Sequence, residues 1–187
     1  MLLFNDALDA LDRGDVAHAV QQLEAFVSIE PEDAEAIVIL AKSERTLGHL
    51  DRAEVRLSSL IAWSPLDIDA MTELAEIKLE KGVPGEAAQL LRRVLEERPN
   101  HFDALFLLGN AFMDVGAMRE AENAYSLSLE TNPFSAQAWY NLARCRHQLD
   151  DAASAISAYE AYLRAAPQAE DRRQVTEWME SLEATLP

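Results

Sequence analysis

The sequence predicts an all-α protein built from five tandem helix–turn–helix repeats, because three residue types recur every 34 residues. Proline occurs in this register at Pro31, Pro65, Pro99, Pro133 and Pro167. Glycine occurs at Gly14, Gly48, Gly82 and Gly116, with Asp150 in the fifth position. Alanine occurs at Ala19, Ala53, Ala87, Ala121 and Ala155. Glycine and proline, which both mark turns, alternate along the chain, so each period contains two helices and two turns.

Each marker has a physical role in this scheme. Glycine ends the first helix, where the chain reversal commonly requires a left-handed backbone. Alanine lies in the second helix, where its small methyl group allows two helix backbones to approach closely. Proline ends the second helix because it lacks an N–H and restricts the residue before it. Asp33, Asp67 and Ser135 then stand where they can cap the next helix.

The pattern resembles the tetratricopeptide repeat, whose signature is W-x2-L-G-x2-Y, then A-x3-F, then P. The fourth repeat shows the signature most fully, at Leu105, Leu108, Gly109, Phe112, Ala121, Tyr125 and Pro133. The fifth shows it at Trp139, Leu142, Ala143, Ala155, Tyr159 and Pro167. Glu44 and Lys78 replace the usual aromatic residue in the second and third repeats, and Arg146 replaces it in the fifth.

The resemblance implies a right-handed α-solenoid that forms a single domain over residues 1–187. The expected repeats are residues 1–33, 34–67, 68–101, 102–135 and 136–169. Residues 170–187 are too short for another helix pair, and one apolar stripe runs through Val175, Trp178, Met179, Leu182 and Leu186. The end of a solenoid needs a cover, so we expect a C-terminal capping helix; the alternative is that the stripe docks on another subunit.

The composition limits the choice of partner. The 33 acidic and 16 basic residues give a net charge of −17, which disfavours nucleic acid and anionic membrane surfaces. A single cysteine, Cys145, allows no intrachain disulfide, and the amino terminus has no basic segment before its apolar residues. No stretch is apolar enough to insert into a membrane. We therefore expect a cytoplasmic protein that binds other proteins.

No arrangement of residues indicates catalysis. His18, His49, His101 and His147 form no pair at ligand spacing, and the glycines form no phosphate-binding cluster. Cys145 has no nearby base and is expected to be a small buried side chain. The tryptophans, including Trp63, are expected to pack between helices. We therefore predict a protein that is not an enzyme and needs no cofactor or metal.

In the tetratricopeptide family, the first helices of successive repeats line a concave surface that holds peptides or partner helices. The resemblance therefore implies a groove that contains Lys42, Asp69, Thr72, Glu73, Glu76, Glu80, Phe106, Asn110, Tyr140, Asn141 and Arg144. One subfamily holds the carboxyl terminus of chaperones with two asparagines and three cations. Asn110 and Asn141 match that pattern, but all three cations are missing, so this ligand is disfavoured.

Asp69, Glu73, Glu76 and Glu80 lie along one face of a predicted helix, with no lysine between them on that face. Like charges four residues apart cost about 0.2–0.5 kcal/mol per pair. The stripe therefore favours a partner that carries Lys or Arg. The alternative is that an acidic chain simply has an acidic solvated face.

The roles of the asparagines and of the chain as a whole each allow two interpretations. Asn110 and Asn141, flanked by Phe106 and Tyr140, can bracket the backbone of an extended peptide, or the asparagines are solvated and the aromatic residues fill gaps between helices. The function predicted for the chain is a non-enzymatic scaffold or adaptor. The rival is a self-assembly module that forms a homo-oligomer or filament through its terminal and convex surfaces.

Overall fold

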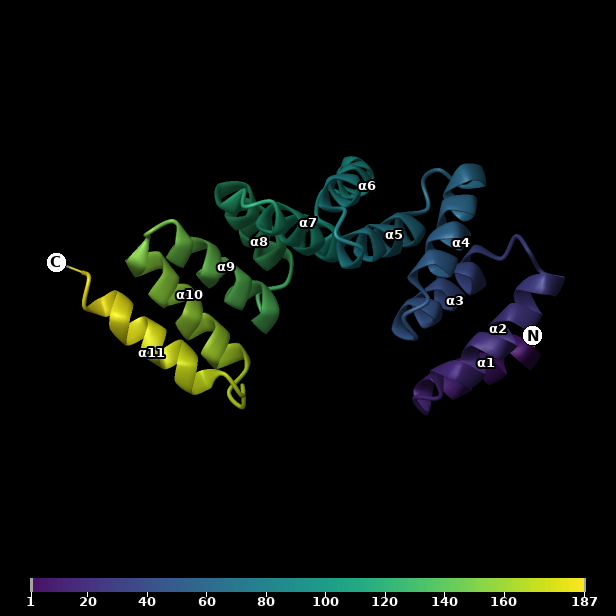
Figure 1. Cartoon of the computed structure of the whole chain (residues 1–187), viewed down its shortest axis with the longest axis horizontal. Coiled ribbons are helices and arrows are strands. Elements are labelled where there is room, and N and C mark those ends of the chain that lie inside the picture. Colours follow the sequence, from purple (N-terminus) through teal and green to yellow (C-terminus); the bar gives the residue numbers. More distant parts are fainter. Residues whose placement is uncertain (1, 187) are drawn as a thin grey trace. The chain divides into compact units, whose positions relative to one another are not determined.

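The described residues 2–186 of this computed structural model form eleven α-helices and no strand. The helices of the N-terminal half are α1 (Leu2–Asp12), α2 (Val16–Ile29), α3 (Ala34–Thr46), α4 (Leu50–Trp63) and α5 (Ile68–Glu80), followed by α6 (Pro84–Glu97). The others are α7 (Phe102–Asp114), α8 (Met118–Thr131), α9 (Ala136–Gln148), α10 (Ala152–Ala165) and α11 (Arg172–Glu183). Helices pack in pairs in an all-α helical repeat array, namely α1 with α2, α3 with α4, α7 with α8 and α9 with α10, and Figure 1 shows this for the first and last of these pairs.

The predicted repeat boundaries agree with the helix starts: α3, α5, α7 and α9 each begin at the first residue of a predicted repeat. The chain divides into two compact units, residues 1–90 and residues 91–187, with the division inside α6. We refer to them as the N-terminal and C-terminal units. The expectation of a single domain stays a prediction, and residues 1 and 187 of the predicted ranges lie outside the described residues.

The turn between the two helices of each repeat has the left-handed residue that the glycine spacing predicts. Gly14, Gly48, Gly82 and Gly116 have φ of 72–79°, and Asp150 has φ of 59°. In every repeat the next residue donates its N–H to the carbonyl five positions earlier, as from His49 to Glu44 at 2.8 Å. This is the Schellman arrangement, which satisfies carbonyls that the helix end leaves without partners.

The predicted helix caps are present too. Asp33, Asp67 and Ser135 accept hydrogen bonds from the backbone N–H three residues later, at 2.9, 2.8 and 3.2 Å. The third repeat ends with a cap that the sequence pattern did not predict, because the Nδ1 atom of His101 accepts from the N–H of Ala104 at 3.2 Å. A neutral imidazole nitrogen can accept in this way, although histidine is an uncommon capping residue.

The core lies both within helix pairs and between successive pairs, as in the cluster that joins Ala7, Leu23 and Leu40 of α1, α2 and α3. The five marker alanines all have 0% exposure. Tyr125 and Tyr159 are the largest fully buried side chains. Gly109 explains how Tyr125 fits, since a Cβ there would lie 2.5 Å from the ring. The prediction for Trp63 is wrong: it is 50% exposed, because it is the last residue of α4.

The C-terminal helix covers the last repeat in the predicted way. Val175 and Leu182 of α11 are buried, and the Trp178 ring lies 5.9 Å from that of Tyr159. The apolar stripe is one residue shorter than predicted, because α11 ends at Glu183 and Leu186 is 43% exposed. No helix in residues 2–186 combines the length and the hydropathy needed to cross a membrane.

The buried alanines generate a stability prediction. Ala121→Leu should lower the free energy of unfolding by about 1–3 kcal/mol, because the larger side chain overpacks a contact with no free space. The matched control is Asn123→Leu, at an exposed position of the same helix. The measurement is urea unfolding followed by circular dichroism. An Ala121→Leu midpoint equal to that of the control would show that α8 does not pack tightly at Ala121.

Candidate functional site

A groove lies between α3 and α5 in the N-terminal unit and encloses about 520 Å³. Its lining residues are Ala34, Glu35, Val38, Ile39, Lys42, Asp67 and Asp69. Val38 is buried and Ile39 is half-buried, so the groove has an apolar floor. The α3–α5 groove thus contains two of the predicted site residues, Lys42 and Asp69.

The charges of the α3–α5 groove are mostly negative. Glu35 and Asp69 are exposed, and no cation of residues 2–186 lies within 4.0 Å of either carboxylate. Asp67 is occupied as a helix cap. Lys42 is the only basic residue of the lining, and its Nζ lies 4.0 Å from the Glu73 carboxylate, outside the groove. The two exposed carboxylates are therefore the uncompensated charges.

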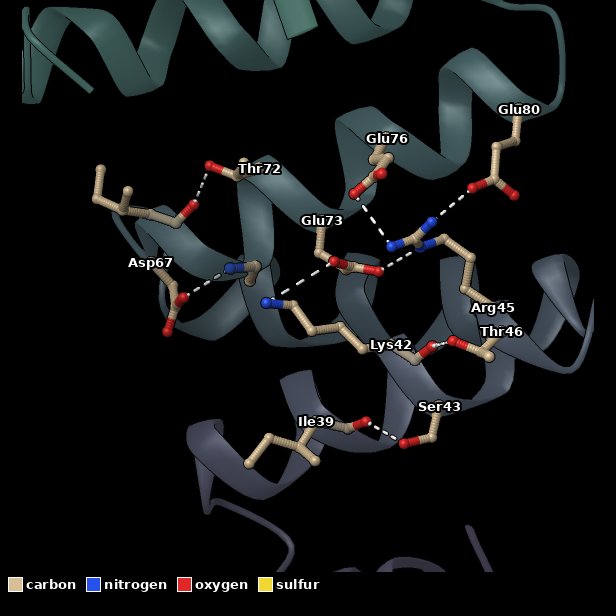
Figure 2. A network of polar contacts seen from close by, with 12 residues as sticks. Ile39, Lys42, Ser43, Arg45, Thr46, Asp67, Thr72, Glu73, Glu76 and Glu80 are labelled. Carbon is tan, nitrogen blue, oxygen red and sulfur yellow. Dashed lines mark hydrogen bonds and ion pairs between the residues drawn. The ribbon is translucent and has the colours of Figure 1, made fainter. Parts of the chain in front are cut away.

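Beside the groove, Arg45 of α3 contacts three carboxylates of α5 (Figure 2). Its Nε lies 2.6 Å from Glu73, one terminal nitrogen 3.1 Å from Glu76, and the other 2.6 Å from Glu80. Glu73 is only 3% exposed, and Arg45 is 22% exposed. We call these four residues the Arg45 network.

Burial and pairing act in opposite directions in the Arg45 network. Burial disfavours the charge on Arg45, but its hydrogen bonds to Glu73 and Glu80 outweigh burial and raise the pKa of the guanidinium. Burial also raises the pKa of Glu76, and the Arg45 charge only partly opposes that rise. The charges of Arg45 and its carboxylate partners are therefore partly shielded from water, which strengthens the charged hydrogen bonds between them.

The Arg45 network corrects the interpretation of the acidic stripe. The positive charge opposite Glu73, Glu76 and Glu80 comes from the neighbouring helix of this chain, so these carboxylates give no reason to expect a basic ligand. Thr72 is also engaged, since its hydroxyl donates to the carbonyl of Ile68 at 2.7 Å. Asp69 is the member of the stripe that stays free.

In the C-terminal unit, the half-buried Asn110 and the buried Asn141 are hydrogen-bonded to each other. The Oδ1 atom of Asn110 accepts from the Tyr125 hydroxyl at 2.7 Å and from Nδ2 of Asn141 at 3.2 Å. Asn141 is 8% exposed and also donates to the Tyr125 oxygen at 3.3 Å. Burial raises the pKa of Tyr125, so its hydroxyl stays a donor. The idea that both asparagines are solvated is therefore wrong.

The predicted aromatic residues of this unit mainly fill space between helices. Phe106 is half-buried, and its ring centroid lies 5.8 Å from that of Tyr125. Tyr140 is half-buried and lies 5.1 Å from Tyr162. The last predicted residue, Arg144, holds its guanidinium carbon 5.9 Å from the centre of the Tyr140 ring. The five predicted residues of this unit thus lie on α7 and α9, and the bond between Asn110 and Asn141 links the two helices.

Sequence reasoning missed a second charge cluster in the N-terminal unit. Glu44 has 0% exposure and accepts two hydrogen bonds from Nε of Arg56, at 3.0 and 2.9 Å. Arg52 lies 2.9 Å from the same carboxylate and also pairs with Glu24. The available signal was the spacing of Arg52 and Arg56, four residues apart and therefore on one face of α4.

Cys145 lies in the core of the C-terminal unit. Cys145 is buried as predicted, and burial raises the pKa of its thiol to about 11. Within residues 2–186, no group of three or more histidine, cysteine and carboxylate side chains is placed to hold a metal ion.

Comparisons with known proteins place the repeats in context. A model of the tetratricopeptide repeat matches residues 4–58 and 72–128, and a second model with that description matches residues 108–180. No curated protein matches the chain.

Several solved structures have a similar fold. The MamA structure from Desulfovibrio magneticus RS-1, residue 41 to the end, has a TM-score of 0.78 and 19% identity over 90% of this chain and 96% of that chain. A thermophilic tetratricopeptide protein from Thermus thermophilus has a TM-score of 0.76 and 19% identity over 95% of this chain and 97% of that chain. At these identities the likeness shows the fold alone.

The Arg45 network gives a stability prediction. Arg45→Gln should lower the free energy of unfolding by about 1–3 kcal/mol, because the buried Glu73 carboxylate loses its charged donor. Adding Glu73→Gln should recover part of the loss, since the unpaired buried charge is then removed.

The control for this experiment is Arg119→Gln on α8, where the side chain is exposed and the change should stay within about 0.5 kcal/mol. Thermal and urea unfolding of all four proteins provide the comparison. A double variant less stable than Arg45→Gln would contradict the assignment of the loss to the buried Glu73 charge.

Proposed function

Because the chain belongs to the tetratricopeptide repeat family, whose arrays are protein-interaction scaffolds, we propose that it is an adaptor whose α3–α5 groove binds a partner segment that carries Lys or Arg. The observation that carries this proposal is the pair of exposed carboxylates, Glu35 and Asp69, that no cation of the described residues compensates. The wider set of groove residues predicted from the sequence stays a proposal.

The dimensions of the groove fit one or two side chains of a partner. A cavity of 520 Å³ is in the lower half of the range of roughly 300–1,000 Å³ for binding pockets. The apolar floor of Val38 and Ile39 can contact the methylene chain of a lysine or arginine, while the carboxylates at the rim meet its charged end. Recognition then uses both parts of the side chain.

The energy available from the charges is modest. An exposed ion pair contributes about 0.2–1 kcal/mol, so Glu35 and Asp69 select a partner without holding it alone. The exposed position also makes the attraction sensitive to salt, because charges are screened beyond about 8 Å at physiological ionic strength. Affinity for a basic segment should therefore fall as salt is added.

The experiment is a binding screen with immobilised decapeptides that differ in their Lys and Arg content. The wild type should bind basic peptides, and Glu35→Gln with Asp69→Asn should weaken the best of them about tenfold, as expected for loss of two charged contacts. The control is Glu96→Gln with Glu120→Gln, which makes the same change in net charge at exposed positions elsewhere.

The control also accounts for an effect on helix stability. Glu35 and Asp69 lie in the first turns of α3 and α5, where a negative charge favours the helix, and Glu120 has the same place in α8. If the control weakens binding equally, or if the affinity is independent of salt, the proposal is wrong.

Self-assembly is the second candidate, because several apolar side chains are exposed. Phe134, in the turn between α8 and α9, is 85% exposed, and Leu2 and Ile29 are 89% and 65% exposed. Such residues can join copies of the chain. Light scattering across a dilution series separates the two candidates: we expect a constant monomer mass for an adaptor, whereas a mass that rises with concentration supports assembly.

A further inference from the structure

A small pocket lies between α8 and α9 of the C-terminal unit, which pack against each other (Figure 1). It encloses about 270 Å³, and its lining residues are Ser126, Leu129, Glu130, Trp139, Leu142 and Arg146. Helix α8 is the second helix of one repeat, and α9 is the first helix of the next. This pocket therefore differs from the groove predicted from the sequence, whose residues all lie on first helices. We call it the α8–α9 pocket.

Apolar side chains of both helices form the wall of the α8–α9 pocket. Leu129 and Leu142 are buried. The half-buried Trp139 donates its indole N–H to the Pro133 carbonyl at 2.8 Å, which holds the ring in one orientation. Phe134, the residue after Pro133, is 85% exposed. Exposed apolar surface next to polar side chains is typical of sites that bind other proteins.

The two charged residues of the lining differ in whether their charge is compensated. Nε of Arg146 lies 2.9 Å from Glu122, and one terminal nitrogen donates to the Ser154 carbonyl at 3.5 Å. Glu130 is exposed, and no cation of the described residues lies within 4.0 Å of its carboxylate. It also lies in the last turn of α8, where the helix dipole disfavours a negative charge. Glu130 is therefore the uncompensated charge of the pocket.

We propose that the α8–α9 pocket binds one apolar side chain of a protein partner, with a neighbouring Lys or Arg of that partner paired to Glu130. A volume of 270 Å³ lies just below the range of roughly 300–1,000 Å³ for pockets that hold whole small molecules, so it suits a single side chain. Because Glu130 lines the same pocket, the apolar residue and the cation lie close together, and adjacent residues of one segment meet this requirement.

The two parts of this recognition contribute differently. Removal of an apolar side chain from water supplies most of the affinity, because this effect grows with the apolar area that is buried. The ion pair with Glu130 is exposed, so it favours a basic over a neutral segment only about two- to fivefold. An acidic segment is repelled by Glu130, and Arg146 does not attract it because Glu122 already compensates the guanidinium.

The test follows the indole N–H signal of Trp139 in ¹⁵N NMR titrations of the full chain, and Trp139→Phe identifies that signal. Five dipeptides with acetyl and amide ends serve as probes. Acetyl-Leu-Arg-amide and acetyl-Arg-Leu-amide carry the apolar side chain and the cation in both orders. Acetyl-Leu-Gln-amide and acetyl-Leu-Glu-amide have a neutral or an acidic side chain instead of the cation, and acetyl-Gly-Arg-amide lacks the apolar side chain.

We expect a saturable shift of the Trp139 signal with at least one of the two basic leucine probes. Its dissociation constant should be about two- to fivefold lower than that of acetyl-Leu-Gln-amide, and added salt should remove this difference. Acetyl-Leu-Glu-amide should bind more weakly than the neutral probe. Acetyl-Gly-Arg-amide should give no saturable shift, because the charge alone does not hold it.

Two variants of the pocket separate the apolar contact from the charge. Glu130→Gln should bind the basic and neutral leucine probes equally, without a lower urea midpoint, because the carboxylate has no partner to lose. Ser126→Phe, at a half-buried position of the lining, should fill the pocket and abolish the shift with every probe.

The controls leave the α8–α9 pocket intact. Glu96→Gln makes the same change as Glu130→Gln at an exposed position in the last turn of α6, and it should leave every affinity unchanged. Glu35→Gln with Asp69→Asn should also bind the probes as the wild type does, because the α3–α5 groove belongs to the N-terminal unit. The proposal for the α8–α9 pocket therefore stands or fails separately from that for the groove.

Four results would overturn the proposal. The first is the lack of a saturable shift with both basic leucine probes. The second is equal binding of the neutral or acidic leucine probe, and the third is equal binding of acetyl-Gly-Arg-amide. The fourth is a Trp139 signal that moves with the concentration of the chain alone, which would show that a second copy occupies the pocket.

Discussion

The hydrogen bond that closes each helix pair is the constraint on which the rest of the structure depends. The N–H after the left-handed residue reaches the carbonyl five positions earlier, and this happens in all five repeats, from Asp15 to Ala10 at 2.9 Å through Asp151 to Arg146 at 3.0 Å. Because this bond fixes where the first helix ends, it also fixes where the second begins. The marker alanine then comes one turn later and is fully buried in every repeat.

The features that the sequence predicted well are those set by local chemistry. Glycine favours a positive φ, proline ends a helix because it lacks an N–H, and the methyl group of alanine permits close helix contact. The repeat period, the turns and the helix starts therefore followed from residue types alone. Asp150 belongs to this class, because aspartate tolerates the left-handed region better than most residues.

The features that the sequence did not predict depend on side chains from different repeats. Arg45 is 28 residues from Glu73 and 35 from Glu80, so spacing along α5 could not show that those carboxylates were paired. The same holds for Asn110 and Asn141, 31 residues apart, whose mutual bond depends on the position of Tyr125. The candidate residues lie on α3 and α5 of the N-terminal unit and on α7 and α9 of the C-terminal unit, and their partners were found only in the structure.

The two cations at the usual aromatic position of the repeat, Lys78 and Arg146, have one explanation in common. Lys78 lies 2.7 Å from Glu54, and Arg146 lies 2.9 Å from Glu122, and the second pair is the first moved along by two repeats. Phe112, between them in register, instead contacts the guanidinium of Arg92 at 5.9 Å. At these two positions an ion pair stands where an aromatic side chain would pack. Each partly buried cation pairs with a carboxylate of the helix just before it in the chain, α4 for Lys78 and α8 for Arg146.

Because the two cations lie two repeats apart, deletions of one repeat and of two repeats have different effects on these ion pairs. Removing one repeat, residues 68–101, would bring Phe112 opposite Glu54 and leave that carboxylate without its cation. Removing two, residues 68–135, would bring Arg146 opposite Glu54 and restore a pair of opposite charges. Deletion of residues 68–135 therefore keeps an ion pair at Glu54, whereas deletion of residues 68–101 loses it.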